Sequence, residues 1–142
     1  MSMKDKTLIT FAGAVGSSKT PITHFLSSRF GLPIFNNDAI RTEVLEDLGV
    51  FDEEEYKRRR DTRLKEIAEN NVSFIYDASI DGEWENLKKG IQSFNYRVFV
   101  ISIDLSKNFL RSLYTIKKYA DSMKQIDALV DDHANFLKKY SD

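Results

Sequence analysis

The stretch of sequence that decides the fold runs from Thr7 to Thr20 and reads TLITFAGAVGSSKT. Its first six residues form a short apolar run rich in β-branched side chains, which is typical of a strand buried on both faces of a parallel sheet. A glycine-containing loop follows, and apolar residues then recur at helical spacing up to Phe30. A strand, a glycine loop and a helix in this order bring loop amides and a helix N-terminus together, an arrangement that binds anions.

The loop matches most of the phosphate-binding pattern G-x-x-x-x-G-K-[ST]. In that pattern the lysine reaches the β- and γ-phosphates and the hydroxyl residue ligates Mg²⁺. Ser18 stands where the second glycine is expected, which removes glycine's conformational freedom unless that residue has near-helical angles. The alternative interpretation is an ordinary glycine-rich turn between a strand and a helix. The residues expected to bind nucleotide phosphates are Gly13, Ala14, Val15, Gly16, Ser17, Ser18, Lys19 and Thr20.

The rest of the chain alternates between strand-like and helix-like segments. Strand-like runs cover 32–35, 72–76 and 97–103, helical patterns cover 38–48, 52–70 and 83–94, and the remainder after Leu105 is helical in two pieces. This alternation indicates βα units with parallel strands and right-handed crossovers. We expect a three-layer α/β P-loop NTPase fold with a mostly parallel sheet of about four strands and a helical C-terminal segment. The first strand should be central, with the third beside it.

Composition limits the possible classes of protein. The 142 residues suit one domain, with a core over 7–104 and lid and C-terminal helices over 105–142. A net charge of -1 argues against a long nucleic acid as partner. The absence of cysteine excludes disulfides, thiolate metal sites and cysteine nucleophiles. No apolar run approaches the roughly 18 residues of a membrane helix, and no signal-peptide pattern precedes the first strand, so we expect a cytoplasmic protein.

Two aspartates follow the predicted second and third strands. Asp38 lies in NNDAIR (36–41) and Asp77 in FIYDAS (74–79). The C-terminal ends of parallel strands line the crevice in which open α/β sheets bind ligands. Each aspartate also has a purely structural interpretation, Asp38 as the N-cap of the next helix and Asp77 as a turn residue.

Together with the loop, these segments resemble the P-loop kinases of the nucleoside/polynucleotide kinase-like group, to which zeta-toxin-type and small-molecule kinases are similar. The resemblance covers about residues 7–111. It implies that Asp38 accepts the proton of the acceptor hydroxyl and that Arg41 holds the acceptor. It further implies that Asp77 and Thr20 hold Mg²⁺ beside bound ATP.

The resemblance also implies a basic lid that covers the phosphates, for which Arg111 is the candidate. Lys117 and Lys118 follow on the same predicted helix, but lysine lacks the planar fork of arginine and a solvated face is the favoured interpretation. Kinases of this group usually have a fifth strand after the lid, ahead of the loop that contacts adenine. No strand-like run follows Leu105.

The expected function is ATP- and Mg²⁺-dependent transfer of the γ-phosphoryl group to a hydroxyl of a small-molecule or nucleotide-like acceptor. Lys19, Asp38, Arg41 and Arg111 are the expected catalytic residues. The alternative is a nucleotide-binding, catalytically degenerate P-loop protein that acts as a regulator or interaction module. Ser18 and the single lid arginine motivate this alternative.

Several charged side chains are interpreted as structural. Acidic residues four positions upstream neutralise much of the arginine cluster at 58–60, which with Arg63 predicts a solvated helix face. Asp81 is assigned to a turn. His24 is interpreted as packed or at the surface, and His133 as a surface residue.

Overall fold

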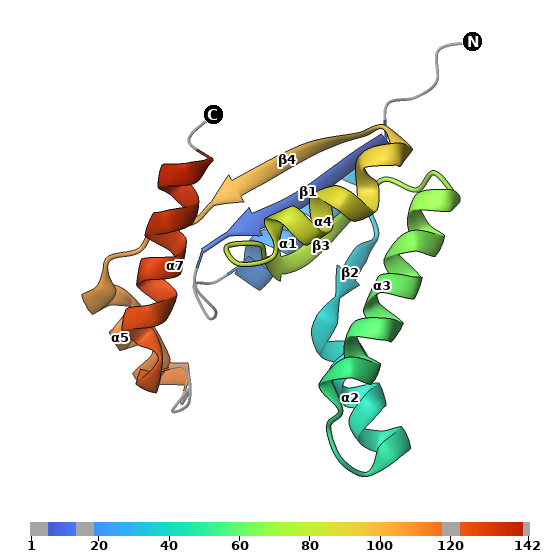
Figure 1. Cartoon of the computed structure of the whole chain (residues 1–142). Coiled ribbons are helices and arrows are strands. Elements are labelled where there is room, and N and C mark those ends of the chain that lie inside the picture. Colours follow the sequence, from blue (N-terminus) through green and yellow to red (C-terminus); the bar gives the residue numbers. More distant parts are fainter. Residues whose placement is uncertain (1–5, 14–18, 118–122, 141–142) are drawn as a thin grey trace.

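The computed structural model describes residues 6–13, 19–117 and 123–140 (Figure 1). Its sheet has four parallel strands in the order β2-β3-β1-β4. The predicted central position of the first strand, with the third beside it, is confirmed. The strands are β1 (Lys6–Ala12), β2 (Ile34–Asn36), β3 (Phe74–Ser79) and β4 (Tyr96–Ser102).

Helices connect the strands and cover both faces of the sheet. In Figure 1, α1 lies behind the sheet and α4 in front of it, which makes three layers. The hairpin of α2 and α3 extends from one end of the sheet and α5 with α7 from the other. The helices are α1 (Lys19–Phe30), α2 (Asn37–Leu48), α3 (Glu53–Glu69), α4 (Trp84–Ile91), the 3₁₀ helix η1 (Gln92–Phe94), α5 (Lys107–Lys117) and α7 (Ile126–Lys139).

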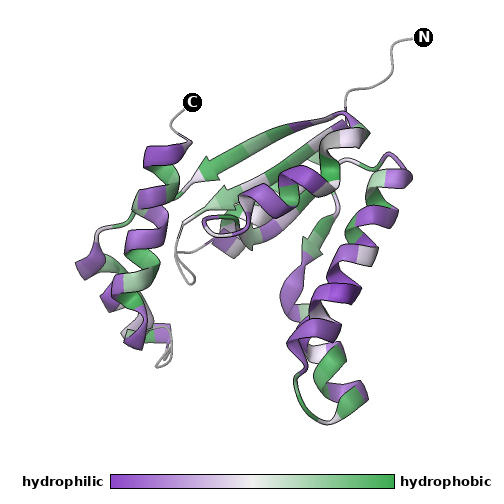
Figure 2. Cartoon of the chain, viewed as in Figure 1, coloured by the Kyte–Doolittle hydropathy of each residue, from purple (hydrophilic) through white to green (hydrophobic). Residues whose placement is uncertain are grey.

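The main core lies between the sheet and the helices in front of it. Leu8 of β1 and Phe74 of β3 pack in one cluster with Leu87 of α4 and Phe136 of α7. Burying each such side chain contributes about 1.5–3 kcal/mol. Figure 2 shows apolar strands in green and a largely hydrophilic α3 in purple. The long helix is thus attached to the core by a narrow apolar stripe.

Helix α2 begins one residue earlier than the sequence suggests. Asn36, in extended conformation at the end of β2, is its N-cap, and its side-chain oxygen accepts from the Asp38 amide at 2.8 Å. The interpretation of Asp38 as the N-cap is therefore wrong. Gly49 ends the helix with φ +75° and donates to the Leu45 carbonyl oxygen, as its position in the sequence predicted.

Strand β3 extends beyond the predicted end at residue 76. Its pairing with β1 shifts between Ile9 and Phe11, so that Phe11 aligns with Ser79. The buried hydroxyl of Thr10 donates to the carbonyl oxygen of Tyr76 at 3.1 Å and satisfies part of the backbone at this irregularity. Asp77 consequently lies within a strand and pairs in register with Asn36 of β2.

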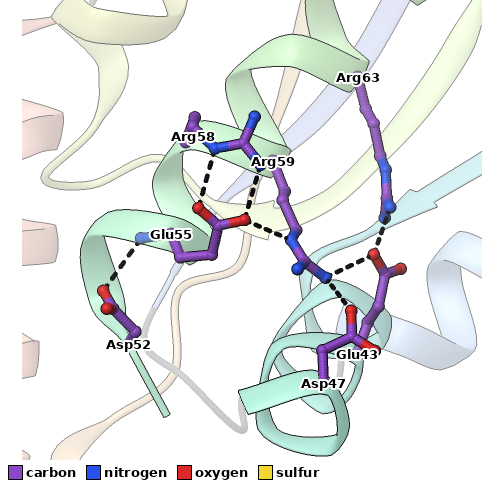
Figure 3. A network of polar contacts seen from close by, with 7 residues as sticks. All are labelled: Glu43, Asp47, Asp52, Glu55, Arg58, Arg59 and Arg63. Atoms are coloured by element: carbon purple, nitrogen blue, oxygen red, sulfur yellow. Dashed lines mark hydrogen bonds and ion pairs between the residues drawn. The ribbon is translucent and has the colours of Figure 1, made fainter.

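An ion-pair network joins α2 to α3 (Figure 3). Arg59 lies at the centre of the network, within 2.8 Å of both Glu43 and Glu55 and 2.7 Å from Asp47. Arg63 reaches Glu43 at 2.6 Å. The prediction of a solvated arginine face is wrong for Arg59 and Arg60, whose side chains are only 17% and 12% exposed. Arg59 is occupied by partners on two helices.

The C-terminal helices form a second small cluster. Leu110 and Tyr114 of α5 pack against Ile126 of α7. Helix α7 also reaches the main core through Phe136, and the hydroxyl of Tyr140, directly after α7, contacts Glu85 of α4. None of the helices within the described ranges is long and apolar enough to span a membrane.

Candidate phosphate-binding and acceptor site

The candidate phosphate loop begins at Gly13, directly after β1. Gly13 is buried and has φ +151°, a backbone conformation that favours glycine. Its amide donates to Oδ1 of Asp81 at 3.1 Å. The predicted phosphate ligands at 14–18 (Ala14, Val15, Gly16, Ser17 and Ser18) lie outside the described residues.

Lys19 is the first residue of α1 and folds back toward the start of the loop. Its Nζ donates to the Gly13 carbonyl oxygen at 3.3 Å. Burial lowers the pKa of Lys19 to about 8, although the charges of Asp81 and Asp77 oppose the shift. Lys19 is therefore a desolvated cation at the entrance of the loop, and a bound anion would favour its charged form.

Thr20 and Asp77 meet beside Lys19. The Thr20 hydroxyl donates to Oδ2 of Asp77 at 3.2 Å, although 57 residues separate them in sequence. A hydroxyl and a carboxylate are oxygen ligands of the kind that Mg²⁺ accepts, usually one or two from the protein with the rest from phosphates and water. Within the ranges that the structure describes, no cluster of three or more His, Asp or Glu side chains could hold a metal ion. The Thr20–Asp77 pair fits a magnesium ion whose remaining ligands would come from phosphates and water.

Asp38 and Arg41 lie on the first turns of α2. Their side chains are 86% and 56% exposed, and Oδ1 of Asp38 lies 3.9 Å from Nη1 of Arg41. The guanidinium group of Arg41 lies 4.9 Å from the ring centre of the buried Tyr56 on α3, and that of Arg60 lies 5.6 Å from the same ring centre. Tyr56 thus gathers two arginines from different helices near Asp38.

A cavity of about 630 Å³ opens between α3 and α4. Arg60 and Tyr76 line it, together with apolar residues that include Leu87. The Tyr76 hydroxyl accepts from the Asn37 amide group at 3.0 Å, which connects the cavity wall to the residue beside Asp38. Arg60, whose side chain is 12% exposed, also binds Asp61 at 2.9 Å. No local pattern in the sequence predicts this cavity, because its two walls come from separate segments.

The lid candidate Arg111 is exposed on α5, and its charge acts on Asp127 of α7. Lys117, in the last turn of α5, acts electrostatically on Lys19 and lowers its pKa further. The charge of Lys117 on α5 thus contributes to the lowered pKa of Lys19. Its interpretation as a solvated residue did not include this effect. Lys118 lies outside the described residues.

Sequence reasoning also missed a histidine with two carboxylate partners. The His133 ring of α7 bonds Oδ1 of Asp81 through Nδ1 at 3.1 Å and Oδ1 of Asp104 through Nε2 at 2.5 Å. The side chain of His133 is 12% exposed, so its interpretation as a surface residue is wrong. Asp81 lies in a turn, as the sequence predicted, but its side chain is only 8% exposed. Helical periodicity could have placed His133 inside, because it lies three residues from both Val130 and Phe136 on the packed face of α7.

Comparison with solved structures identifies the fold. A scan against known protein families and a search of curated proteins find no match. The chain is similar to a chain of the Pnkp1/Rnl/Hen1 RNA repair complex, with a TM-score of 0.78 and 16% identity over 98% of this chain and 47% of that one. A candidate kinase from Chloroflexus aurantiacus has a TM-score of 0.68 and 17% identity, over 88% of this chain and 76% of the other. Shikimate kinase from Acinetobacter baumannii has a TM-score of 0.57 and 13% identity, over 94% and 79%.

The chain therefore has an α/β fold of the P-loop kinase type, as its resemblance in sequence indicated. At these identities the likeness shows the fold alone. The activity has to be argued from the side chains of the site.

Proposed function

We propose that this protein is an ATP- and Mg²⁺-dependent phosphotransferase that moves the γ-phosphoryl group to a hydroxyl of a small-molecule or nucleotide-like acceptor. The observation that carries the proposal is the meeting of Thr20 and Asp77 at 3.2 Å beside the desolvated Lys19. A cation and a pair of oxygen ligands stand next to a loop whose sequence matches most of a phosphate-binding pattern. These are the groups that phosphoryl transfer requires at the donor.

The donor half of the site consists of the loop, Lys19 and the start of α1. Lys19 would bind the β- and γ-phosphates, while Thr20 and Asp77 would hold Mg²⁺. When bound, the magnesium ion neutralises charge that develops on the phosphate oxygens. Lys117 of α5, whose charge acts on Lys19, would add positive charge near the phosphates.

The acceptor half consists of Asp38, Arg41 and the cavity between α3 and α4. Because Asn36 caps α2, the carboxylate of Asp38 is available to accept the proton of an acceptor hydroxyl. Arg41 would position the acceptor. The mixed apolar and basic walls of the cavity suit an acceptor that carries both an apolar part and an anionic or polar part.

Asp38→Asn separates transfer from nucleotide binding. We expect this variant to lose about 10²–10⁴-fold in transfer rate while it keeps its affinity for ATP, because only the base is removed. Transfer is measured as ADP release and as labelled product with sugars, nucleosides and an oligonucleotide with a free 5′-hydroxyl. Glu46→Gln is the matched control, since Glu46 is an exposed acid on the same helix.

A catalytically degenerate nucleotide-binding regulator is the second candidate. It is favoured by the exposure of Arg111, whose charge acts on Asp127 of α7. It predicts tight binding of ATP without transfer to any acceptor. Wild type and Asp38→Asn would then behave alike, and the kinase proposal would fail.

A further inference from the structure

The side chains that join α7 to the loop lie outside the proposed donor and acceptor groups. Asp81 follows β3, Asp104 follows β4 and His133 belongs to α7, so three separate segments meet at one imidazole ring. Ser102 donates to the same oxygen of Asp104 at 3.1 Å. The cluster therefore connects the ends of two strands to the C-terminal helix.

Asp81 extends this connection to the phosphate loop. The oxygen that bonds His133 at 3.1 Å also accepts the Gly13 amide at 3.1 Å. Gly13 is the first residue of the loop, and its carbonyl oxygen accepts from Lys19. A chain of direct polar contacts thus runs from α7 through Asp81 and Gly13 to Lys19.

The negative charge of Asp81 disfavours the binding of phosphate at the loop. A carboxylate beside Gly13 repels phosphate oxygens, and its field also acts on Lys19. A protonated His133, 88% removed from solvent, would offset that charge at close range. Asp104 binds the other ring nitrogen, so the imidazolium would be shared between two carboxylates.

We propose that Asp81 and His133 are positioning residues of the phosphate loop. Asp81 fixes the amide of Gly13, and protonated His133 fixes Asp81 and offsets its charge against bound phosphate. The inference rests on the proposed function for its claim about phosphate, and on the contacts alone for its claim about Gly13.

The direction of the pH effect follows from His133. Burial opposes protonation of the ring, but the hydrogen bonds and charges of Asp104 and Asp81 raise its pKa above the ordinary histidine value of 6.5. The two carboxylates are the groups that face the ring, and Lys19, Lys117 and Asp77 complete the charged neighbourhood on the loop side. Below the raised pKa, protonated His133 offsets the negative charge of Asp81. Above that pKa, neutral His133 no longer offsets it. Phosphate affinity should therefore fall as pH rises through that pKa.

The claim about Gly13 is tested without a ligand. We expect the Gly13 amide to exchange with deuterium about tenfold faster in Asp81→Ala than in Asp81→Asn, because asparagine keeps an acceptor oxygen and alanine does not. His133→Gln should also accelerate this exchange, and His24→Gln should not, since His24 is exposed on α1. Equal exchange of Gly13 in all four variants would overturn the inference.

The claim about phosphate is tested by calorimetric titration of the same variants with ATP between pH 5.5 and 8.5. At pH 6 we expect His133→Gln to bind about threefold to tenfold more weakly than His24→Gln. The ratio should approach one at the alkaline end. Because ATP and Lys19 titrate in both variants, their contributions cancel in the ratio. A ratio of affinities that does not depend on pH would overturn the role of His133. Absence of ATP binding in every variant would instead overturn the proposed function. The exchange rate of the Gly13 amide would then still test the contact between Asp81 and Gly13.

Discussion

At the residue scale, Asn36 caps helix α2 and leaves the nearby Asp38 without a capping role. Asn36 binds the free amide at the start of α2, and the Asp38 side chain remains 86% exposed. A carboxylate with no capping role can change its protonation without disturbing the helix. This arrangement suits a base that acts on a ligand.

The assignment of Asn36 as the N-cap predicts that substitutions at Asn36 and Asp38 change the free energy of unfolding by different amounts. Asn36→Ala should lower the free energy of unfolding by about 1 kcal/mol, because a helix amide loses its partner. Asp38→Ala should change it by less than about 0.5 kcal/mol, as at other exposed sites. Urea unfolding monitored by circular dichroism measures both. Equal losses in the two variants would show that Asp38 also supports the helix.

The lowered pKa of Lys19 predicts proton uptake on nucleotide binding. Burial lowers the pKa to about 8, so part of the lysine is uncharged at pH 8.5, and bound phosphate would restore the charge. Titration of the wild type with ATP at pH 8.5, in two buffers of different ionisation enthalpy, should reveal uptake of a fraction of one proton. Affinity should also fall above pH 8.

Lys19→Arg is the control, because arginine is always charged in this range. Uptake at pH 8.5 should disappear in this variant. Uptake of the same size in wild type and Lys19→Arg would assign the proton to another group.

Local patterns in the sequence predicted much of the candidate site at this scale. The glycine loop ahead of α1 marks Lys19 and Thr20, and the apolar run of the third strand leads to Asp77. Asp81 and His133 could not be paired from sequence, because 52 residues separate them and the contact depends on where α7 packs. The hydrophobic period of α7 places His133 on the inner face, but it does not name a partner.

At the element scale, ion pairs join α2 and α3 in addition to the buried side chains of Ile40, Val44 and Tyr56. Glu55 accepts two hydrogen bonds from Arg58, at 2.8 and 2.6 Å, and one from Arg59 at 2.8 Å (Figure 3). The sequence predicted Arg58 to pair with Glu54, four residues earlier. The structure instead pairs it with Glu55, because that carboxylate bridges both arginines.

This network predicts an acid transition in the hairpin. The hydrogen bonds from Arg58 and Arg59 lower the pKa of Glu55 to about 2 from its ordinary 4.5. A carboxylate with a depressed pKa contributes stability that is fully present above pH 4.5 and is lost as pH falls through about 2. The free energy of unfolding of the wild type should therefore decrease between pH 4.5 and 2.

Glu55→Gln should make this decrease shallower. The matched control is Glu54→Gln, because the neighbouring Glu54 is an exposed acid of the same helix. Urea unfolding at pH 3, 4 and 6 compares the slopes. Identical slopes in the two variants would contradict the assignment to Glu55.

Element types were predictable, and their ends were less so. The alternation of strand and helix follows from periodicity, but β3 continues past Asp77 because Thr10 of the neighbouring strand supports the irregular backbone. Likewise, the choice between Asn36 and Asp38 as cap depends on where β2 ends. Such ends are decided by contacts between strands that no local pattern contains.

At the scale of the whole molecule, the sheet order brings together residues from distant parts of the chain. β1 lies between β3 and β4, so Gly13, directly after β1, bonds Asp81 after β3. On the other side, the Ala12 carbonyl oxygen at the end of β1 accepts from the amide of Ile103, the neighbour of Asp104. Helix α7 then joins the two sides through His133. The C-terminal segment is thereby part of the site's surroundings.

Burial of apolar strands and right-handed crossovers makes the fold class predictable from sequence. The cavity between α3 and α4 is a property of the assembled molecule, because its walls come from helices that are far apart in the sequence. Assays that identify the acceptor therefore use the intact chain.

The central claim, that the loop binds a nucleotide through Lys19, is tested most directly by calorimetric titration with ATP and Mg²⁺ of wild type, Lys19→Ala and Lys88→Ala. Lys88 is an exposed lysine of α4 and serves as the matched control. We predict that wild type and Lys88→Ala bind with the same affinity and that Lys19→Ala binds about tenfold to hundredfold more weakly, as expected for the loss of a charged hydrogen bond to phosphate. Equal heats and affinities for all three proteins would contradict the account.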